Sequence, residues 1–278
     1  MVGPERTLDG LAMLGQSIEM SSEKDLKILP DQPAPSSAQC VRDLVDWIAD
    51  NQQVVFTRTQ NPEVDEPPFY KVSTMGDYVN NGLPRTLELL TGETLPTPKR
   101  RNWTYRALAS LGEIGVEFDG HPEWMADLYR LNTTLYLVSE NILNLILDCD
   151  PSSIETSKPL IVGKHASFIG PYWVVMPCRV VDAVDIAKST VEVRRPAIYR
   201  GASRYVTEVY YRPGFSIRSQ PSETSCFLEE FSGDWFWRKS MIEAAAERGI
   251  RGLLFGYRQV KESSREIRLR GPIDPIDW

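Results

Sequence analysis

The stretch IGPYWVVMPCRVVDAVDIAKS, from Ile169 to Ser189, is the most distinctive part of this sequence of 278 residues. Its first half is the apolar run from Tyr172 to Met176, which does not alternate with polar residues and is therefore typical of a strand buried on both faces. Pro177 has no backbone N–H to give to a sheet, so we expect a bulge or a sheet edge there that separates two half-strands. The stretch thus predicts a central strand that is interrupted near its end.

Two aspartates, Asp182 and Asp185, follow this strand at positions three residues apart. Carboxylates at this spacing could bind a divalent metal or act as an acid and a base, but such sites need further ligands. No histidine, glutamate or asparagine stands beside them to complete a site. Aspartate and serine also close turns where a strand ends. We therefore predict structural roles for Asp182, Asp185 and Ser189, with no catalytic residues and no metal.

Short strands and a few short helices flank this stretch on its C-terminal and N-terminal sides. TTLYLV is predicted to be a strand, Ser139 an N-cap, ENILNLIL a helix and LIVG a second strand. The same plan returns near the end, where DWFW leads into the helix RKSMIEAAAER and the strand IRGLLFGYRQV, with a Schellman stop at Gly249 and Ile250. Strands outnumber helices, so the predicted class is α+β with mixed or antiparallel sheets and strand–helix–strand modules in the C-terminal half.

The rest of the chain gives a coarser prediction. CVRDLVDWIADN is expected to be a helix that buries Val41, Leu44, Val45 and Ile48, with Trp47 beside this face. QVVFTRTQ, FYKVST, STVEVRRPAIYR and RYVTEVYYR are expected to be strands, and YRALASLGE a short helix. The stretch PDQPAPSSA is rich in proline and serine, which predicts a flexible or extended segment. These patterns predict a flexible extension over 1–38, an α+β portion over 39–132 and a core over 133–278. The core could form one domain with the 39–132 portion.

Composition narrows the class of protein. A net charge of −7 and a pI near 5.1 argue against general nucleic-acid binding and favour a basic partner. The four cysteines, Cys40, Cys149, Cys178 and Cys226, are too sparse for a disulfide scaffold and wrongly spaced for zinc. No apolar run approaches the length of a membrane span or a signal peptide. We expect a cytoplasmic protein without cofactor or membrane partner. Met20, followed by SSEKDLK, resembles the N-terminus of a protein, so it stays open whether residues 1–19 are native.

Two alternatives to a binding protein remain open. An enzyme is one, but the sequence has no G-x-S-x-G, no phosphate loop, and only His121 and His165 as histidines. A nucleic-acid or regulatory adaptor is the other, because Lys99 to Arg106 mixes cations with Trp103 and Tyr105 as single-strand binders do. The acidity of the whole chain counts against the adaptor.

The segment PSETSCFLEEFSGDWFW, residues 221–237, favours protein binding more directly, and we call it the acidic-aromatic segment. It carries acidic residues and aromatics without any basic residue, a combination suited to a binding surface for a basic partner. For Phe236 and Trp237 we favour burial in the core, whereas Trp235 could lie in the core or at the surface. The candidate partner-binding residues are Glu223, Glu229, Glu230, Asp234 and Trp235.

Three stretches, taken in order, resemble one known family. They are LYLVSENILNLILDCDPSSIETSKPLIV, GPYWVVMPCRVVDAVDIAKSTVEV and FWRKSMIEAAAERGIRGLLF. Together they resemble the domain first named for a myxobacterial immunity protein, which is found in bacterial polymorphic-toxin gene clusters. The likeness covers about Thr133 to Val260, and Arg238 departs from it because the family carries a helix-capping serine there. The residues that match the family pattern and would support its fold are Pro171, Tyr172, Asp182, Asp185, Ser189, Gly249 and Gly252.

The resemblance implies an immunity protein, a binder that neutralises a cognate toxin in interbacterial competition and is not an enzyme. The partner would be a toxin protein, expected to be basic, that meets a surface which the motif residues only support. The alternatives are a hydrolase-like enzyme using Asp182, Asp185 and His165, and the adaptor with its Lys99–Arg106 patch. The sequence does not indicate the toxin, the stoichiometry or the oligomeric state.

Overall fold

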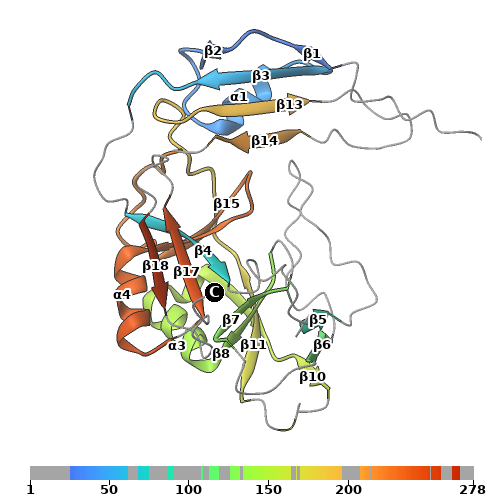
Figure 1. The fold of residues 1–278 in the computed structure, drawn as a ribbon, viewed down its shortest axis with the longest axis vertical. Helices are drawn as coiled ribbons and strands as arrows, with labels where there is room; N and C mark the ends of the chain where they lie inside the picture. The colour runs from blue at the N-terminus through green and yellow to red at the C-terminus, as the bar shows by residue number, and fades with distance from the viewer. Residues whose placement is uncertain are drawn as a thin grey trace, which may run out of the picture.

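A computed structural model describes residues 26–61, 68–74, 87–89, 108, 113–118, 126–131, 134–163, 167, 170–195, 207–212, 215–250, 252–257 and 265–269. Within these residues short helices and many short strands form mixed and antiparallel sheets (Figure 1), so the predicted α+β class is confirmed.

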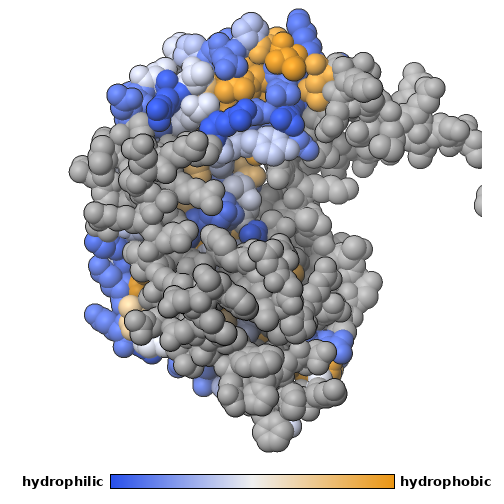
Figure 2. Space-filling view, viewed as in Figure 1, coloured by the Kyte–Doolittle hydropathy of each residue, from blue (hydrophilic) through white to orange (hydrophobic). Residues whose placement is uncertain are grey.

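The upper part of the molecule in Figure 1 is a five-stranded sheet with a helix packed on it. Its strands are β1 (Lys27–Ile28), β2 (Gln32–Pro33), β3 (Gln52–Thr57), β13 (Val191–Arg195) and β14 (Glu208–Tyr211), with β1, β3, β13 and β14 side by side and β2 also paired with β3. Helix α1 (Val41–Trp47) confirms the predicted helix and buries the four predicted apolar residues against β3 and β13. In the same view, Figure 2 shows a band of hydrophilic residues beside a smaller hydrophobic group on this part, as expected of a sheet with one face in the core.

The opening stretch provides the centre of a second, four-stranded sheet. β11 (Tyr172–Pro177) lies between β8 (Tyr136–Ser139) and β9 (Ile154–Ser157), and β7 (Leu128–Arg130) pairs with β8. Both faces of β11 are covered, as the unbroken apolar run predicts. β8 pairs only as far as Val175, so Pro177 has a partner on the β9 side alone and the predicted edge is confirmed. The two half-strands are separated by a change of sheet, because β12 (Val180–Val181) joins a different one.

That third sheet has six strands in the order β12, β15 (Cys226–Glu229), β16 (Trp235–Arg238), β4 (Phe69–Thr74), β17 (Leu253–Tyr257) and β18 (Arg265–Leu269). Strands β10 (Leu160–Val162), β6 (Gly115–Phe118) and β5 (Leu87–Leu89) form a smaller sheet. β3 and β4 come from the predicted 39–132 portion, yet they pair with β13, β16 and β17 from the 133–278 portion. The two predicted portions therefore share sheets. Residues 26–38, expected to be flexible or extended, contribute β1 and β2 along β3.

Both predicted strand–helix–strand modules are present. α3 (Glu140–Cys149) follows β8, and a short 3-10 turn, η4 (Pro151–Ser153), leads to β9. α4 (Lys239–Glu247) connects β16 to β17. The predicted Schellman stop of α4 is confirmed, because Gly249 has a φ of 66° and its N–H donates to the Ala246 carbonyl at 3.0 Å. The Ile250 N–H donates to the Ala245 carbonyl at 3.1 Å, which completes the motif.

The two modules are copies of one arrangement. In each, an antiparallel pair of strands leads into a helix and then a third strand, and a strand from elsewhere in the chain lies between the second and third strands. The first copy is β7–β8–α3–β9 around β11, and the second is β15–β16–α4–β17 around β4. The registers agree, since Tyr172 lies opposite Ser139 as Phe69 lies opposite Arg238. The spacing from Ser139 to Ile154 equals that from Arg238 to Leu253. The structure thus contains an internal repeat.

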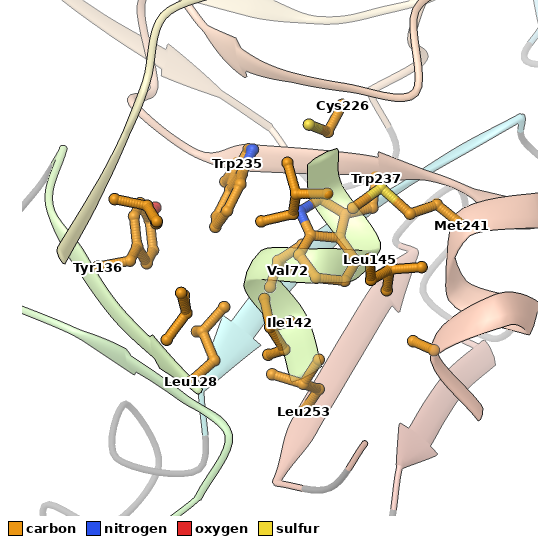
Figure 3. Close-up of a cluster of buried hydrophobic side chains, with 14 of the residues drawn as sticks. Val72, Leu128, Tyr136, Ile142, Leu145, Cys226, Trp235, Trp237, Met241 and Leu253 are labelled. Carbon is orange, nitrogen blue, oxygen red and sulfur yellow. The ribbon is translucent and has the colours of Figure 1, made fainter. Parts of the chain in front are cut away.

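The two copies share a hydrophobic core. Tyr136 and Trp235 hold equivalent positions in the two hairpins, and their rings touch with centroids 4.7 Å apart. α3 lies beside α4, and Ile142 and Met241, again equivalent, belong to the same buried cluster. Figure 3 shows side chains from both copies pointing into this cluster. Each copy therefore covers the apolar face that the other cannot bury alone.

Candidate functional site

Asp182, the first aspartate of the opening stretch, lies at the N-terminal end of α1. Its carboxylate accepts hydrogen bonds from the backbone N–H groups of Val41 at 3.3 Å and Arg42 at 2.8 Å. The first N–H groups of a helix have no partner within the helix, and a negative charge there also complements the helix dipole. Arg218 lies 3.6 Å from the same carboxylate. Asp182 therefore serves as a capping group for a helix about 140 residues earlier in the chain.

Asp185 and Ser189 close the turn after β12. One carboxylate oxygen of Asp185 accepts hydrogen bonds from the N–H groups of Ala187 at 3.1 Å and Lys188 at 3.3 Å. The Ser189 hydroxyl is buried and accepts a hydrogen bond from the Ser216 N–H at 2.8 Å. These bonds give Asp185 and Ser189 structural roles in the turn. Within the part of the chain that the structure describes, no cluster of side chains could hold a metal ion.

Other motif residues converge on Ala126 and Asp127, just before β7. The Tyr172 hydroxyl donates to the Ala126 carbonyl at 2.9 Å, and the Ser139 hydroxyl donates to the Asp127 carboxylate at 2.6 Å. Gly252, with a φ of 79°, passes so close that a Cβ there would lie 2.6 Å from the Ala126 Cβ. The two hydrogen bonds fix the start of β7 within the first copy of the repeat, and the close approach of Gly252 packs the second copy against it.

Proline carbonyls begin both helices of the repeat. The Pro171 carbonyl accepts from the Glu140 N–H at 3.2 Å at the start of α3, and the Pro68 carbonyl accepts from the Lys239 N–H at 3.0 Å at the start of α4. The predicted N-cap of α3 is confirmed, because the Ser139 hydroxyl accepts from the Ile142 N–H.

α4 has no side-chain cap at the equivalent position. Arg238 instead donates to the carbonyls of Thr224 at 2.8 Å and Pro221 at 2.6 Å, and its guanidinium lies 4.8 Å from the Phe69 ring centroid. Arg238 therefore holds the loop before β15 and leaves α4 without a side-chain cap.

Two of the five candidate partner-binding residues are internal. Trp235 is fully buried between Tyr136 and Trp237, because β16 is a central strand covered on both faces. Glu229 is also fully buried. Neither side chain reaches the surface of the free protein, which corrects the expectation that both could form direct contacts there. Phe236 and Trp237 lie in the core, as expected.

Glu229 joins the upper sheet to the six-stranded sheet. One of its carboxylate oxygens accepts from the Tyr211 hydroxyl of β14 at 3.0 Å, and the other accepts from the N–H groups of Phe231 at 3.0 Å and Ser232 at 2.7 Å. Burial raises the pKa of Glu229 to about 7, although the hydrogen bonds from Ser232 and Tyr211 oppose this shift. Burial likewise raises the pKa of Tyr211 well above its usual value. The carboxyl of Glu229 therefore titrates near neutral pH.

The remaining acidic candidates lie nearer the surface, and two of them have cationic partners. Asp234 pairs with Lys71 of β4 at 2.9 Å, and Glu230 pairs with Arg42 of α1 at 2.5 Å. The segment itself contains no basic residue, but cations from elements distant in sequence compensate Asp234 and Glu230, so the acidic surface expected there is partly neutralised. Glu223 is exposed.

Comparison with known protein families finds a match over part of the chain. The model of the immunity protein family (Imm11) matches residues 96–219, a little under half of the chain. Over these residues the chain is similar to this immunity protein family, which confirms there the resemblance predicted from the motifs. The match contains Pro171, Tyr172, Asp182, Asp185 and Ser189, whereas the closing module and the segment from Glu223 to Trp235 lie beyond it. A search of curated proteins found no match.

Several sequence-based predictions fall outside the described residues. They concern His121, His165, the Lys99–Arg106 patch and all but Leu108 and Glu113 of the helix predicted in YRALASLGE. Among the described residues, no helix is both long and apolar enough to cross a membrane.

Local patterns gave no signal for two features of the site. Both the capping of α1 by Asp182 and the ion pairs of Arg42 and Lys71 depend on contacts between elements far apart in sequence.

Proposed function

We propose that this protein is an immunity protein that binds a cognate toxin and neutralises it through a protein–protein interface. The observation that carries the proposal is the immunity family match over residues 96–219. The motif residues within that match hydrogen-bond to backbone groups of the protein itself. This use of their polar atoms supports a scaffold role for them and leaves binding to the surface that the scaffold carries.

Within this proposal the toxin is a basic protein in a polymorphic-toxin system, met in the cytoplasm during interbacterial competition. The acidic chain favours it, because opposite charge speeds encounter and complements a basic surface. Glu223, Glu230 and Asp234 stay candidate contacts. Glu229 and Trp235 would act indirectly, by fixing the loop from Glu230 to Asp234 between two buried anchors.

Co-expression tests the proposal. The protein is produced together with the product of the reading frame adjoining its gene, with growth and complex formation as readouts. Rescue of growth, with a complex of the two purified proteins, is the expected result. The double variant Glu223→Lys and Glu230→Lys should weaken the complex if these residues make contacts.

Toxicity that persists at full expression of this chain, with no complex between the purified proteins, would overturn the proposal. Turnover of ester, phosphoester or nucleic-acid substrates that is lost on His165→Ala would favour the enzyme alternative instead.

A further inference from the structure

We propose that the outward face of α1, centred on Trp47 and flanked by Asp43 and Asp46, is a docking surface for a basic protein surface that accepts the indole ring. The inference rests on the proposed function, because it takes that partner to be the toxin. It differs in location from the acidic-aromatic segment singled out by sequence.

Trp47 is the anchor of this face. Its side chain is 46% exposed, although tryptophan normally buries a large share of its surface. Its ring stands edge-on to the buried Phe56, with centroids 5.5 Å apart and planes at 77°. The contact packs the indole against the core while leaving much of its surface open. Tryptophan is enriched at binding hot spots, and a side chain already packed on one side loses less entropy when it is covered.

The charge around Trp47 indicates the chemistry of the partner. Asp43 and Asp46 precede it by four residues and one residue, so Asp43 and Trp47 lie on one side of the helix with Asp46 adjacent. Hydrogen bonds from the backbone around Gln39 and Cys40 lower the pKa of Asp43, which keeps it ionised. Asp50 follows the helix and pairs with Arg195, which is itself largely buried. Arg42 pairs with Glu230, and Arg218 also helps to lower the pKa of Asp43. Among the described residues around this face, four carboxylates outnumber three guanidinium groups: Asp43, Asp46, Asp50 and Glu230 against Arg42, Arg195 and Arg218. The net charge of the face is therefore negative and complements a basic surface.

The mounting of α1 is a second, independent observation. A helix of seven residues is not stable on its own, yet both ends of α1 are fixed from outside. Asp182 holds its first N–H groups, and the Arg195 guanidinium donates to the Ile48 carbonyl at 2.7 Å where the helix ends. Both residues belong to the matched immunity region, whereas α1 lies outside it. The family domain therefore supports, at two points, a helix that the family pattern does not include, and presents it preorganised for binding.

Two variants and two matched controls test the inference. Trp47→Ala removes the anchor, and Asp46→Lys reverses the charge beside it. Leu147→Ala on α3 removes another exposed apolar side chain, and Glu247→Lys on α4 reverses another exposed carboxylate. The probe is the purified product of the adjoining reading frame, with dissociation constants and association rates measured at low and high salt.

We expect Trp47→Ala to weaken binding by about 30-fold or more, as hot-spot truncations do. Asp46→Lys should slow association by about tenfold at low salt and by less at high salt, since salt screens the steering field. Both controls should stay within about threefold of the wild type. Should Trp47→Ala fail to fold, Asp46→Lys decides the question alone, because its side chain is exposed.

The outcomes separate this inference from the proposed function. If the wild type binds the probe and both variants bind equally well, the toxin docks elsewhere and the inference fails while the proposed function stands. If the wild type does not bind at all, the proposed function itself fails. A concentration-dependent dimer that is lost on Trp47→Ala would assign the face to self-association and would also overturn the inference.

Discussion

Asp182 and Asp185 direct their carboxylates at backbone N–H groups, not at each other or at a shared ligand. Their spacing resembles that of a catalytic or metal-binding pair, but the chain turns between them and each carboxylate completes a different local structure. Asp182 caps α1, and Asp185 closes the turn that follows β12. Residue type and spacing alone are therefore poor guides to chemistry when the same residues are also good caps.

Replacing Asp182 with Asn should lower the free energy of unfolding by about 1 kcal/mol. The amide can accept only through its single oxygen and carries no charge to complement the helix dipole or Arg218. Urea unfolding followed by circular dichroism measures the change. Asp31→Asn is the matched control, because Asp31 is exposed and its replacement should have little effect. Stoichiometric divalent-metal binding that disappears in Asp182→Asn would contradict the structural role.

Glu229 should make stability depend on pH. Its pKa is about 7 in the folded protein against 4.5 as the ordinary value, so the folded state holds a proton that the unfolded state releases between these pH values. The contribution of this group to stability is therefore fully present at or below about pH 4.5. It falls as pH rises from there through about 7, by about 3 kcal/mol in total.

Glu229→Gln should remove this dependence. The amide oxygen can accept from the Phe231 and Ser232 N–H groups while the amide nitrogen donates to the Tyr211 hydroxyl oxygen, so the hydrogen bonds survive without a charge. Urea titrations should show the variant more stable than the wild type at pH 8 and equal to it near pH 4.5. The exposed Glu247→Gln serves as control. If Glu229→Gln and the wild type keep the same difference at both pH values, the buried carboxyl is not the titrating group.

At the scale of elements, much of the secondary structure follows from local pattern. The helix from Val41, the Ser139 cap, the Schellman stop at Gly249 and the central strand from Tyr172 can all be predicted, because each depends on residues within one or two turns. The internal repeat cannot be predicted this way. Its two hairpins share hardly any residue identity, and the residue before the helix is Ser139 in one copy and Arg238 in the other. The inserted strands, β11 and β4, come from unrelated positions in the chain.

The same limit explains the errors at the candidate site. The pattern of acidic and aromatic residues around Glu229 and Trp235 is compatible with an exposed loop or with a central strand. Only the pairing of β16 with both β15 and β4 determines that Trp235 is buried. Trp47 is the converse case, because its place beside the apolar face of α1 does not reveal that nearly half of its side chain remains exposed.

Two glycines between α4 and β17 offer a matched comparison at this scale. Gly249 and Gly252 both have positive φ, but a Cβ on Gly249 would meet nothing within 4 Å, whereas one on Gly252 would lie 2.6 Å from the Ala126 Cβ. Gly249→Ala should lower the free energy of unfolding by about 1 kcal/mol, the conformational contribution alone. Gly252→Ala should lower it by about 3 kcal/mol, because β7 must also shift. Equal losses in chemical denaturation would show that the two copies of the repeat are not packed this tightly at Ala126.

At the scale of the whole molecule, the immunity family region is not a self-contained unit. Residues 96–219 include all of β7, β8, α3, β9 and β11, so one copy of the repeat is complete within them. The second copy requires β4 from before this region and β15, β16, α4 and β17 from after it. β13 and β14 belong to the matched region, but their sheet is completed by β3, and its core by α1, from the first sixty residues.

A fragment of residues 96–219 should therefore fail to fold cooperatively, although it contains the entire family match. Without the second copy, Tyr136, Ile142 and Ile146 would lose Trp235, Trp237 and Met241 as packing partners in the shared core. Without β3 and α1, Val191 and Val193 would be exposed to water. The loss of burial on both sides of the fragment exceeds the few kcal/mol by which a domain of this size is normally stable. Urea unfolding and amide proton dispersion of the fragment, compared with residues 26–269, measure the difference. A sharp two-state transition in the fragment would contradict this, because it would mean that residues 96–219 fold independently of the second copy of the repeat, β3 and α1.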